Sequence, residues 1–134
     1  MIYCLDTNII SFYLKNRYNV RKRINDEGDT NIFVMCPISY YEVKRGFIRH
    51  NSTTKLAEFV DGFIPLCPVG DVDRAMLDRA CEIYSDLTKE GRIIEDADIL
   101  IAAFCIANGY TLVTDNTKHF ERIPTLEVAN WAEK

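Results

Sequence analysis

Near its N-terminus the chain reads IYCLDTNIISFYL, residues 2–14. Its first four residues form a short apolar run that is typical of a buried strand. Asp6, Thr7 and Asn8 follow, and all three are residue types that favour the N-terminus of a helix. The apolar residues from Ile9 to Leu14 continue as that helix. A strand that passes directly into a helix is the first half of a βαβ unit, so this stretch predicts an α/β fold.

The rest of the chain repeats this alternation. Further strands are predicted at Asn31–Cys36, Ile64–Val69, Tyr110–Thr114 and Leu126–Val128. Further helices are predicted at Val20–Asp26, from the capping-box pattern Ser39–Glu42 onward, and at Thr54–Phe63, Val72–Leu87 and Asp98–Ala107, the last capped by Asp96. With no repeat, linker or low-complexity stretch, we expect one domain over residues 1–134, built as a three-layer α/β/α sandwich around a mainly parallel sheet.

Composition excludes several classes of protein. The 134 residues are 48% hydrophobic and 27% charged, as in ordinary globular proteins, and no apolar run approaches the roughly 20 residues of a membrane helix. The N-terminus has no basic lead-in to an apolar segment, so we expect a cytoplasmic protein without a membrane partner. The five cysteines have no zinc-binding spacing and are expected to be reduced core thiols, although a single reactive thiol is an alternative.

The net charge of −4 hides an uneven distribution. Nine of the 16 lysines and arginines lie between Lys15 and Lys55. A polyanion would be attracted to this part of the surface, and Lys44, Arg45 and Arg49 are candidate contacts to it. The alternative is that these residues belong only to solvated helix faces.

Acidic and amide side chains occur where predicted strands pass into helices. In a parallel sheet these places meet at one edge. They are Asp6 after the first strand, Glu42 in the helix after the second, Asp98 in the first turn of an apolar helix, and Asp115 with Asn116 after Thr114. Each also has an ordinary structural interpretation, as a helix cap, a capping-box partner or a turn residue.

Their joint placement favours a metal site. Asp98 begins a helix that is apolar almost all round, so its carboxylate should lie near the core and needs a partner. Several carboxylates without a matching lysine or arginine repel one another unless a cation lies between them. Oxygen ligands select hard ions, so Mg²⁺ or Mn²⁺ fits better than zinc. No Ser-His-Asp or Cys-His arrangement competes, and His50 and His119 are expected at the surface.

These blocks resemble PIN-domain nucleases, in particular the VapC toxins of bacterial toxin–antitoxin pairs. Residues 5–8, Leu-Asp-Thr-Asn, are similar to the opening of that family, and residues 42–46 to its second block, a Glu followed at this interval by Gly. Residues 98–103 resemble its third block and residues 112–131 its closing block. The blocks keep their order and spacing over nearly the whole chain.

The resemblance implies an Mg²⁺- or Mn²⁺-dependent endoribonuclease, with Asp6, Glu42 and Asp98 as the metal-binding acids. It gives supporting hydrogen-bonding roles to Thr7, Asn8 and Thr114. The fourth acidic position is Asp115 or Asn116, and with it a second metal ion stays open. The resemblance also implies an RNA substrate, in many members tRNA, a homodimer, and a small VapB-like antitoxin whose tail covers the active site.

Four other interpretations remain. A housekeeping RNA-processing nuclease of the same fold would carry the same residues. A phosphatase of the haloacid dehalogenase type needs a second Asp where this chain has Asn8. A receiver-like signalling domain needs a phosphorylatable Asp at the end of the middle strand, where this chain has Cys36 and Pro37. A PIN fold that only binds partners would have no reason to retain the acids.

Overall fold

The sheet is parallel throughout. The computed structural model describes residues 1–134 and contains four strands in the order β2-β1-β3-β4. They are β1 (Ile2–Leu5), β2 (Ile32–Val34), β3 (Thr111–Val113) and β4 (Val128–Ala129). Cys4 pairs with Val34 on one side and with Leu112 on the other. All four strands therefore end at the same edge, which is where the predicted acidic residues were expected to gather.

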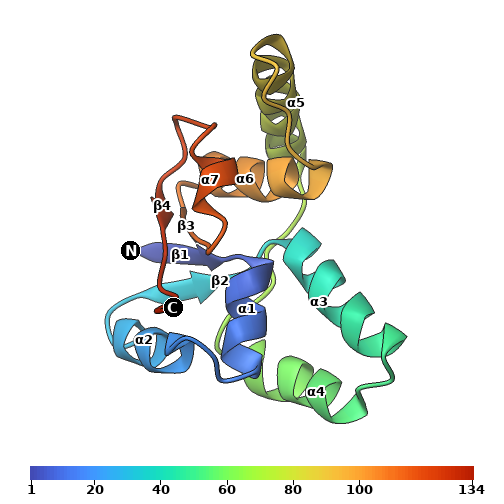
Figure 1. Cartoon of the computed structure of the whole chain (residues 1–134), viewed down its shortest axis with the longest axis vertical. Helices are drawn as coiled ribbons and strands as arrows, with labels where there is room; N and C mark the ends of the chain where they lie inside the picture. Colours follow the sequence, from blue (N-terminus) through green and yellow to red (C-terminus); the bar gives the residue numbers. More distant parts are fainter.

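Helices cover both faces of this sheet, as the sequence predicted (Figure 1). The elements on one face are α1 (Thr7–Leu14), α2 (Val20–Glu27), α3 (Pro37–Arg49), α4 (Thr53–Ala57) and the π-helical stretch η1 (Glu58–Phe63). Those on the other face are α5 (Arg74–Lys89), α6 (Asp96–Asn108) and the short α7 (Thr117–Phe120). Helix α5 packs on α6 and projects away from the sheet as an arm (Figure 1).

Two apolar cores follow from the alternation of side chains along the strands. Cys4 and Leu112 point into the core beneath α5 and α6. Their neighbours Leu5 and Val113 point into the core beneath α1, α2 and η1. Successive residues of a strand face opposite sides, so a short strand that is apolar at every position must be covered on both.

The apolar helix predicted at Asp98–Ala107 is α6, and it lies in the middle of the molecule. Its residues Ile99 and Ile101–Cys105 are buried. Gly109 ends it with a left-handed backbone, φ 74°, a conformation that glycine adopts without strain. A helix buried on most of its surface is rigidly held, and so is the acidic first turn that it carries.

The segment between η1 and α5 differs from the prediction. The strand predicted at Ile64–Val69 is wrong, because this segment forms turns and makes only an isolated bridge between Val69 and Met35. Pro65 and Pro68 lack the N–H groups that a strand needs on both sides. The helix predicted at Thr54–Phe63 is divided into α4 and η1, and α7 was not predicted.

Two helix starts also differ. Helix α3 begins at Pro37 with Cys36 as its N-cap, so the capping box predicted from Ser39 does not form. Proline is favoured in the first turn because its missing N–H needs no partner there. Helix α6 is preceded by Glu95, whose side chain makes no capping hydrogen bond, and Asp96 is already helical.

The cysteines are all reduced, and four of them are buried as expected. Cys81 on α5 is exposed, so its prediction as a core thiol is wrong. No helix has both the length and the apolar character needed to cross a membrane.

Candidate active site

Asp6 lies at the carboxyl end of β1 and caps α1. The residue is 4% exposed. One oxygen, Oδ1, accepts a hydrogen bond from the Thr7 backbone N–H at 2.8 Å. The other, Oδ2, accepts from the Thr114 hydroxyl at 2.7 Å and from the Asn8 amide at 3.4 Å. The cap predicted here is confirmed, and the same carboxylate also faces the end of β3.

The charge of Asp6 is not neutralised by any basic side chain. Burial, opposed in part by the hydrogen bonds from Thr114 and Thr7, raises the pKa of Asp6 to about 6, and the negative charges of Asp98 and Glu42 add to the rise. These two carboxylates come from other elements than Asp6 and add their negative charge to its surroundings. No lysine or arginine forms an ion pair with any of them.

Glu42 lies in the second turn of α3 and faces α1. Its Oε1 accepts a hydrogen bond from the Thr7 hydroxyl at 2.8 Å. Because α3 begins at Pro37, Glu42 is free of the capping role that the sequence also allowed. Thr7, the residue that follows Asp6, is therefore hydrogen-bonded to Glu42, and this contact keeps the two acidic positions side by side.

Asp98 is the third residue of α6, and its side chain is 20% exposed. Its Oδ2 lies 3.1 Å from Nδ1 of His119 on α7. His119 was expected at the surface in a polar turn; its side chain is 40% exposed, but it lies in the helix α7 and contacts Asp98. The one sequence signal for it is its spacing of three residues from Asn116 at the start of a short helix.

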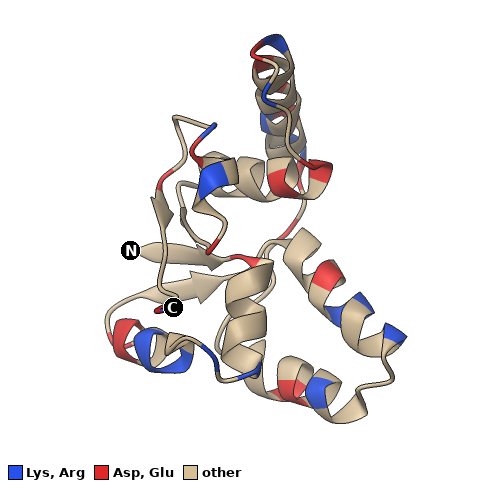
Figure 2. Cartoon of the chain, viewed as in Figure 1, with Lys and Arg blue, Asp and Glu red and all other residues tan.

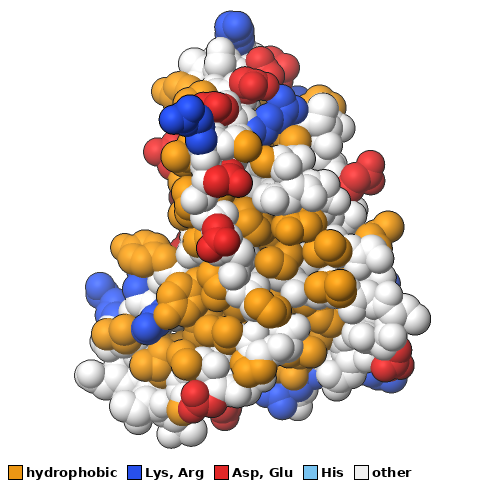
Figure 3. All heavy atoms as spheres, turned by 180° about the vertical axis from the view of Figure 1, so that it is seen from behind, with side chains coloured by type: hydrophobic (Ala, Val, Ile, Leu, Met, Phe, Trp, Pro, Cys, Tyr) orange, Lys and Arg blue, Asp and Glu red, His pale blue; other side chains and the backbone are white.

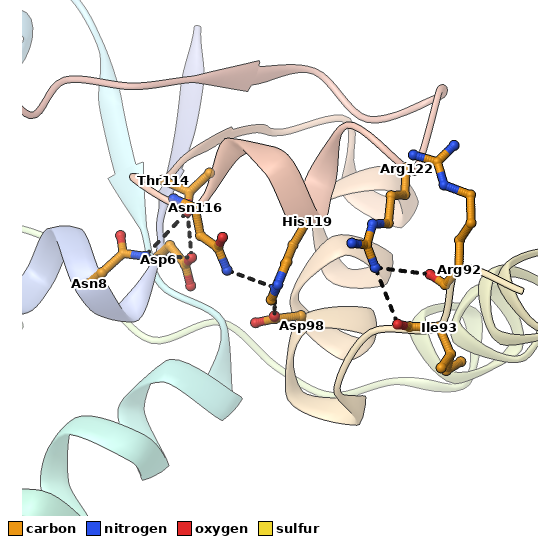
Figure 4. Close-up of polar contacts among 9 residues, drawn as sticks. All are labelled: Asp6, Asn8, Arg92, Ile93, Asp98, Thr114, Asn116, His119 and Arg122. Carbon is orange, nitrogen blue, oxygen red and sulfur yellow. Dashed lines mark hydrogen bonds and ion pairs between the residues drawn. The ribbon is translucent and has the colours of Figure 1, made fainter.

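The segment after β3 separates Asp115 from Asn116. The Asp115 carboxylate turns toward the C-terminus, where it pairs with Lys134 and accepts a hydrogen bond from Asn130 at 3.2 Å. The hydrogen bond from the Lys134 ammonium holds the pKa of Asp115 below its ordinary value. Asn116 instead turns its amide toward His119, with 2.8 Å between Nδ2 and Nδ1 (Figure 4). Asn116 is therefore the residue of this pair that lies on the side of Asp98.

Asn8 and Thr114 connect the two halves of the site. The Asn8 amide nitrogen lies 3.4 Å from the Thr114 hydroxyl, and its Oδ1 accepts a hydrogen bond from the Asp115 backbone N–H at 3.1 Å. Thr114 is fully buried. Together they tie the start of α1 to the end of β3, so the polar residues there share one hydrogen-bonded network (Figure 4).

The donor set fits a hard divalent cation. It consists of carboxylate, hydroxyl and amide oxygens, and it includes a buried carboxylate without a cationic partner. In their present positions no three Asp, Glu, His or Cys side chains are arranged to hold one metal ion. Glu42 faces Thr7, and Asp98 faces His119 with one oxygen. Both residues are only partly buried, so their side chains are not held in place by packing alone.

A groove leads away from this site between α1 and α3. It has a volume of about 410 Å³ and is lined at one end by Thr7 and Glu42 and at the other by Lys15 and Lys55. Figure 2 shows the acidic position of α3 near the strand ends and its basic residues further along the helix. Sequence patterns gave no indication of this groove, because its walls come from segments that are distant in the chain.

The three basic candidates all belong to α3. Lys44 donates a hydrogen bond to the Tyr40 hydroxyl at 2.9 Å, and the Arg45 guanidinium lies 4.9 Å from the centre of the Tyr41 ring. Arg45 and Arg49 are exposed and form no ion pair with an acid. Their charges are therefore open to a ligand.

Comparison with known proteins defines the class to which this fold and site belong. The family model for the PIN domain matches residues 3–126, and the chain belongs to the PIN-domain family. Among curated proteins, it is 30% identical over 133 residues to a tRNA(fMet)-specific endonuclease VapC of Shigella flexneri, covering 97% of this chain and 98% of that protein. It is also 30% identical to Ribonuclease VapC2 of Rickettsia felis, covering 98% of each chain. Within the PIN-domain family it is therefore a member of the VapC ribonucleases.

Solved structures agree with this membership. VapBC2 from Rickettsia felis, bound to a DNA fragment from its promoter, matches with a TM-score of 0.90 and 30% identity, covering 98% of this chain and 99% of that one. VapBC-1 from nontypeable Haemophilus influenzae matches with a TM-score of 0.86 and 27% identity, covering 98% of each chain. The predicted α/β/α fold is confirmed.

Proposed function

We propose that this chain is a metal-dependent endoribonuclease that acts as the toxin of a toxin–antitoxin pair. The observation that carries the proposal is Asp6, a buried carboxylate with a pKa raised to about 6, two acidic neighbours and no basic partner. Such a group is costly for the fold unless a cation binds there. Membership of the VapC ribonucleases supports RNA as the substrate.

Asp6, Glu42 and Asp98 would hold the ion, and their oxygen ligands favour Mg²⁺ or Mn²⁺. Bound there, the ion would lower the pKa of an attacking water and offset the charge of the scissile phosphate. Thr114 keeps Oδ2 of Asp6 in place by hydrogen bonding. Thr7 does the same for Glu42, and both hydroxyls remove the need for a basic side chain that would compete with the ion.

For the fourth position we propose Asn116 rather than Asp115. The Asp115 carboxylate forms an ion pair with Lys134 and accepts a hydrogen bond from Asn130. Its negative charge is therefore already neutralised by a side chain that does not contact Asp98. Its backbone N–H, held by Asn8, still fixes the course of the chain beside the site. An amide at the fourth position leaves fewer negative charges in the site, which eases the approach of a phosphodiester.

Lys44, Arg45 and Arg49 would contact the phosphates of the RNA on either side of the cleaved bond. Their place on α3, the helix that carries Glu42, supports this role. The name of the Shigella relative, a tRNA(fMet)-specific endonuclease, supports tRNA as the class of RNA to test first.

A VapB-like antitoxin is the protein partner that the solved VapBC complexes support. We propose that its tail covers the acidic site in the inactive complex, and that the chain forms a homodimer in the cytoplasm. Apolar side chains gather in a broad area on the back of the molecule (Figure 3), and a groove of about 350 Å³ between α5 and α6 is lined mainly by apolar residues such as Leu77 and Tyr84. Exposed apolar areas of this kind usually mark protein contacts.

Cleavage of RNA by the purified chain tests the proposal. We expect cleavage with Mg²⁺ or Mn²⁺, none in EDTA, and a loss of at least about 100-fold in Asp6→Asn and Asp98→Asn. The matched control is Asp78→Asn on α5, which makes the same chemical change at an exposed position and should retain wild-type activity. Equal activity in EDTA, or full activity in both site variants, would contradict the proposal.

A further inference from the structure

His119 contacts the site from α7, a helix outside the acidic motifs. Its Nδ1 lies 3.1 Å from Oδ2 of Asp98 and 2.8 Å from Nδ2 of Asn116 (Figure 4). The helix is anchored by Phe120, which is fully buried in the core beneath α5 and α6. The imidazole is thus carried by the anchored helix α7 and reaches the first turn of α6.

The segment that carries His119 contacts two of the acids at once. Thr114 donates its hydroxyl proton to Asp6 and accepts a hydrogen bond from the Asn116 backbone N–H at 3.0 Å. The Asn116 side chain then meets His119, and His119 meets Asp98. A continuous chain of polar contacts therefore joins Asp6 to Asp98 through residues 114–119.

The position of the ring proton follows from the acceptor. One ring nitrogen cannot accept from the Asn116 amide and donate to Asp98 at the same time. An ionised carboxylate can only accept hydrogen bonds. If Nδ1 carried no proton, its lone pair would face a lone pair of Oδ2, and the two atoms would repel each other. The arrangement that stabilises Asp98 has the proton on Nδ1, with the Asn116 amide turned so that its oxygen faces the ring.

We propose that His119 is a positioning residue that fixes the Asp98 carboxylate for metal binding; this inference rests on the proposed function. By donating Nδ1–H to Oδ2, it fixes the rotation of the carboxylate and leaves Oδ1 to the ion. Hydrogen bonds to a metal-binding side chain from residues that do not bind the metal themselves commonly raise metal affinity by 10- to 100-fold. Since the His119 side chain is 40% exposed, it adds little to packing, so its value lies in this contact.

Two substitutions separate the hydrogen bond from the rest of the side chain. An asparagine at this position carries its amide nitrogen where Nδ1 stands, and a glutamine carries it further out, near Nε2. His119→Asn should therefore keep the donor to Asp98, whereas His119→Gln and His119→Ala should lose it. Lys118→Ala is the matched control, because Lys118 is exposed on the same helix and contacts none of the acids.

Binding of Mn²⁺, followed by the electron paramagnetic resonance of the free ion, measures this effect without reference to cleavage. We expect the Kd for Mn²⁺ to rise about 10-fold in His119→Ala and His119→Gln. It should stay within about threefold of wild type in His119→Asn and Lys118→Ala. In an Asp98→Asn background, His119→Ala should cause no further loss, because it acts through Asp98.

Each other outcome has a definite meaning. An unchanged or lower Kd in His119→Ala, failure of His119→Asn to restore binding, or an equal loss in the Asp98→Asn background would overturn the positioning role. A wild-type chain that binds Mn²⁺ with the expected variant pattern but cleaves no RNA would refute the proposed function alone. A wild-type chain that cleaves RNA with Mn²⁺ while His119→Ala binds the ion normally would refute this inference alone.

Discussion

At the scale of one residue, Asp6 shows that a side chain suited to metal binding lowers the stability of the metal-free fold. Its carboxylate is buried beside two other acids, and its pKa is raised to about 6 from an ordinary value of 3.8. The folded chain therefore holds this proton more tightly than the unfolded chain does. As the pH rises from about 4 to above 6, the folded state loses stability through this group, by at most about 3 kcal/mol.

Asp6→Asn should consequently stabilise the metal-free protein at pH 7.5 while it abolishes cleavage. The amide keeps the hydrogen bond from the Thr7 N–H and removes the buried charge. We expect the melting temperature in EDTA to rise, and the gain to disappear at pH 4, where Asp6 is mostly protonated. A fall in melting temperature at pH 7.5 would show that the charge of Asp6 is satisfied within the chain. Thermal unfolding at the two pH values measures both effects.

Thr114→Val should have the opposite effect on stability. It removes the buried hydroxyl that donates to Asp6 and accepts from the Asn116 N–H. Leaving these groups unpaired costs about 1–3 kcal/mol. Thr114→Ser keeps the hydroxyl and serves as the control, with most of the stability retained. Denaturant unfolding of the two variants measures the difference, and a loss in Thr114→Ser as large as that in Thr114→Val would show that the hydroxyl matters no more than the methyl group.

Sequence reasoning found the acids for a physical reason. Asp6 and Asp98 each adjoin a strongly apolar element, so their positions in the fold follow from hydrophobic patterns near them in the chain. His119 had no such pattern, because its contact with Asp98 depends on how α7 packs across α6. Similarly, nothing local distinguishes Asp115 from Asn116, since Lys134 and Asn130, which hold Asp115, belong to the end of the chain.

At the scale of elements, the segment between η1 and α5 shows how packing overrides local preference. Its apolar residues suggested a strand, but it passes close beneath α6. A Cβ added at Gly70 would lie 2.5 Å from Cζ of Phe104, a buried ring of α6. The backbone can approach α6 only because residue 70 has no side chain, and no periodicity of the sequence shows this.

Gly70→Ala should therefore destabilise the fold by about 1–3 kcal/mol, because the Phe104 ring must move within a filled core. Gly62→Ala is the matched control, since a Cβ there meets nothing within 4 Å and the residue lies in η1. We expect it to be neutral or slightly stabilising. Denaturant midpoints of the two variants provide the measurement, and a neutral Gly70→Ala would show that this contact is loose.

At the scale of the whole molecule, the net charge is −4, but nine of the 16 lysines and arginines lie between Lys15 and Lys55. The uneven distribution was evident in the sequence. The sequence did not show which of the basic residues remain without an acidic partner. Ion pairs that depend on the folded helices engage Lys22, Arg23, Lys55 and Arg79. Arg45 and Arg49 of α3 form none, and they lie on the helix that also carries Glu42.

Arg45→Ala and Arg49→Ala should each weaken RNA binding and reduce its dependence on salt. Each phosphate contact that is lost lowers the slope of log K against log salt by about 0.7 for single-stranded RNA. Arg74→Ala on α5 removes an equal charge from an exposed position and should leave the slope unchanged. Titrations of a catalytically inactive Asp98→Asn chain at several salt concentrations measure it. An unchanged slope in both α3 variants would mean that this helix face is only solvated.

The convergence of Asp6, Glu42 and Asp98 on a shared divalent cation is tested most directly by a crystal structure of the chain grown with Mn²⁺. The anomalous scattering of manganese locates the ion without assumptions about ligands. We expect a peak about 2.1–2.2 Å from a carboxylate oxygen of Asp6 and of at least one of the other two acids. A peak only at other residues, or a fully ordered site with no peak at millimolar Mn²⁺, would contradict this account.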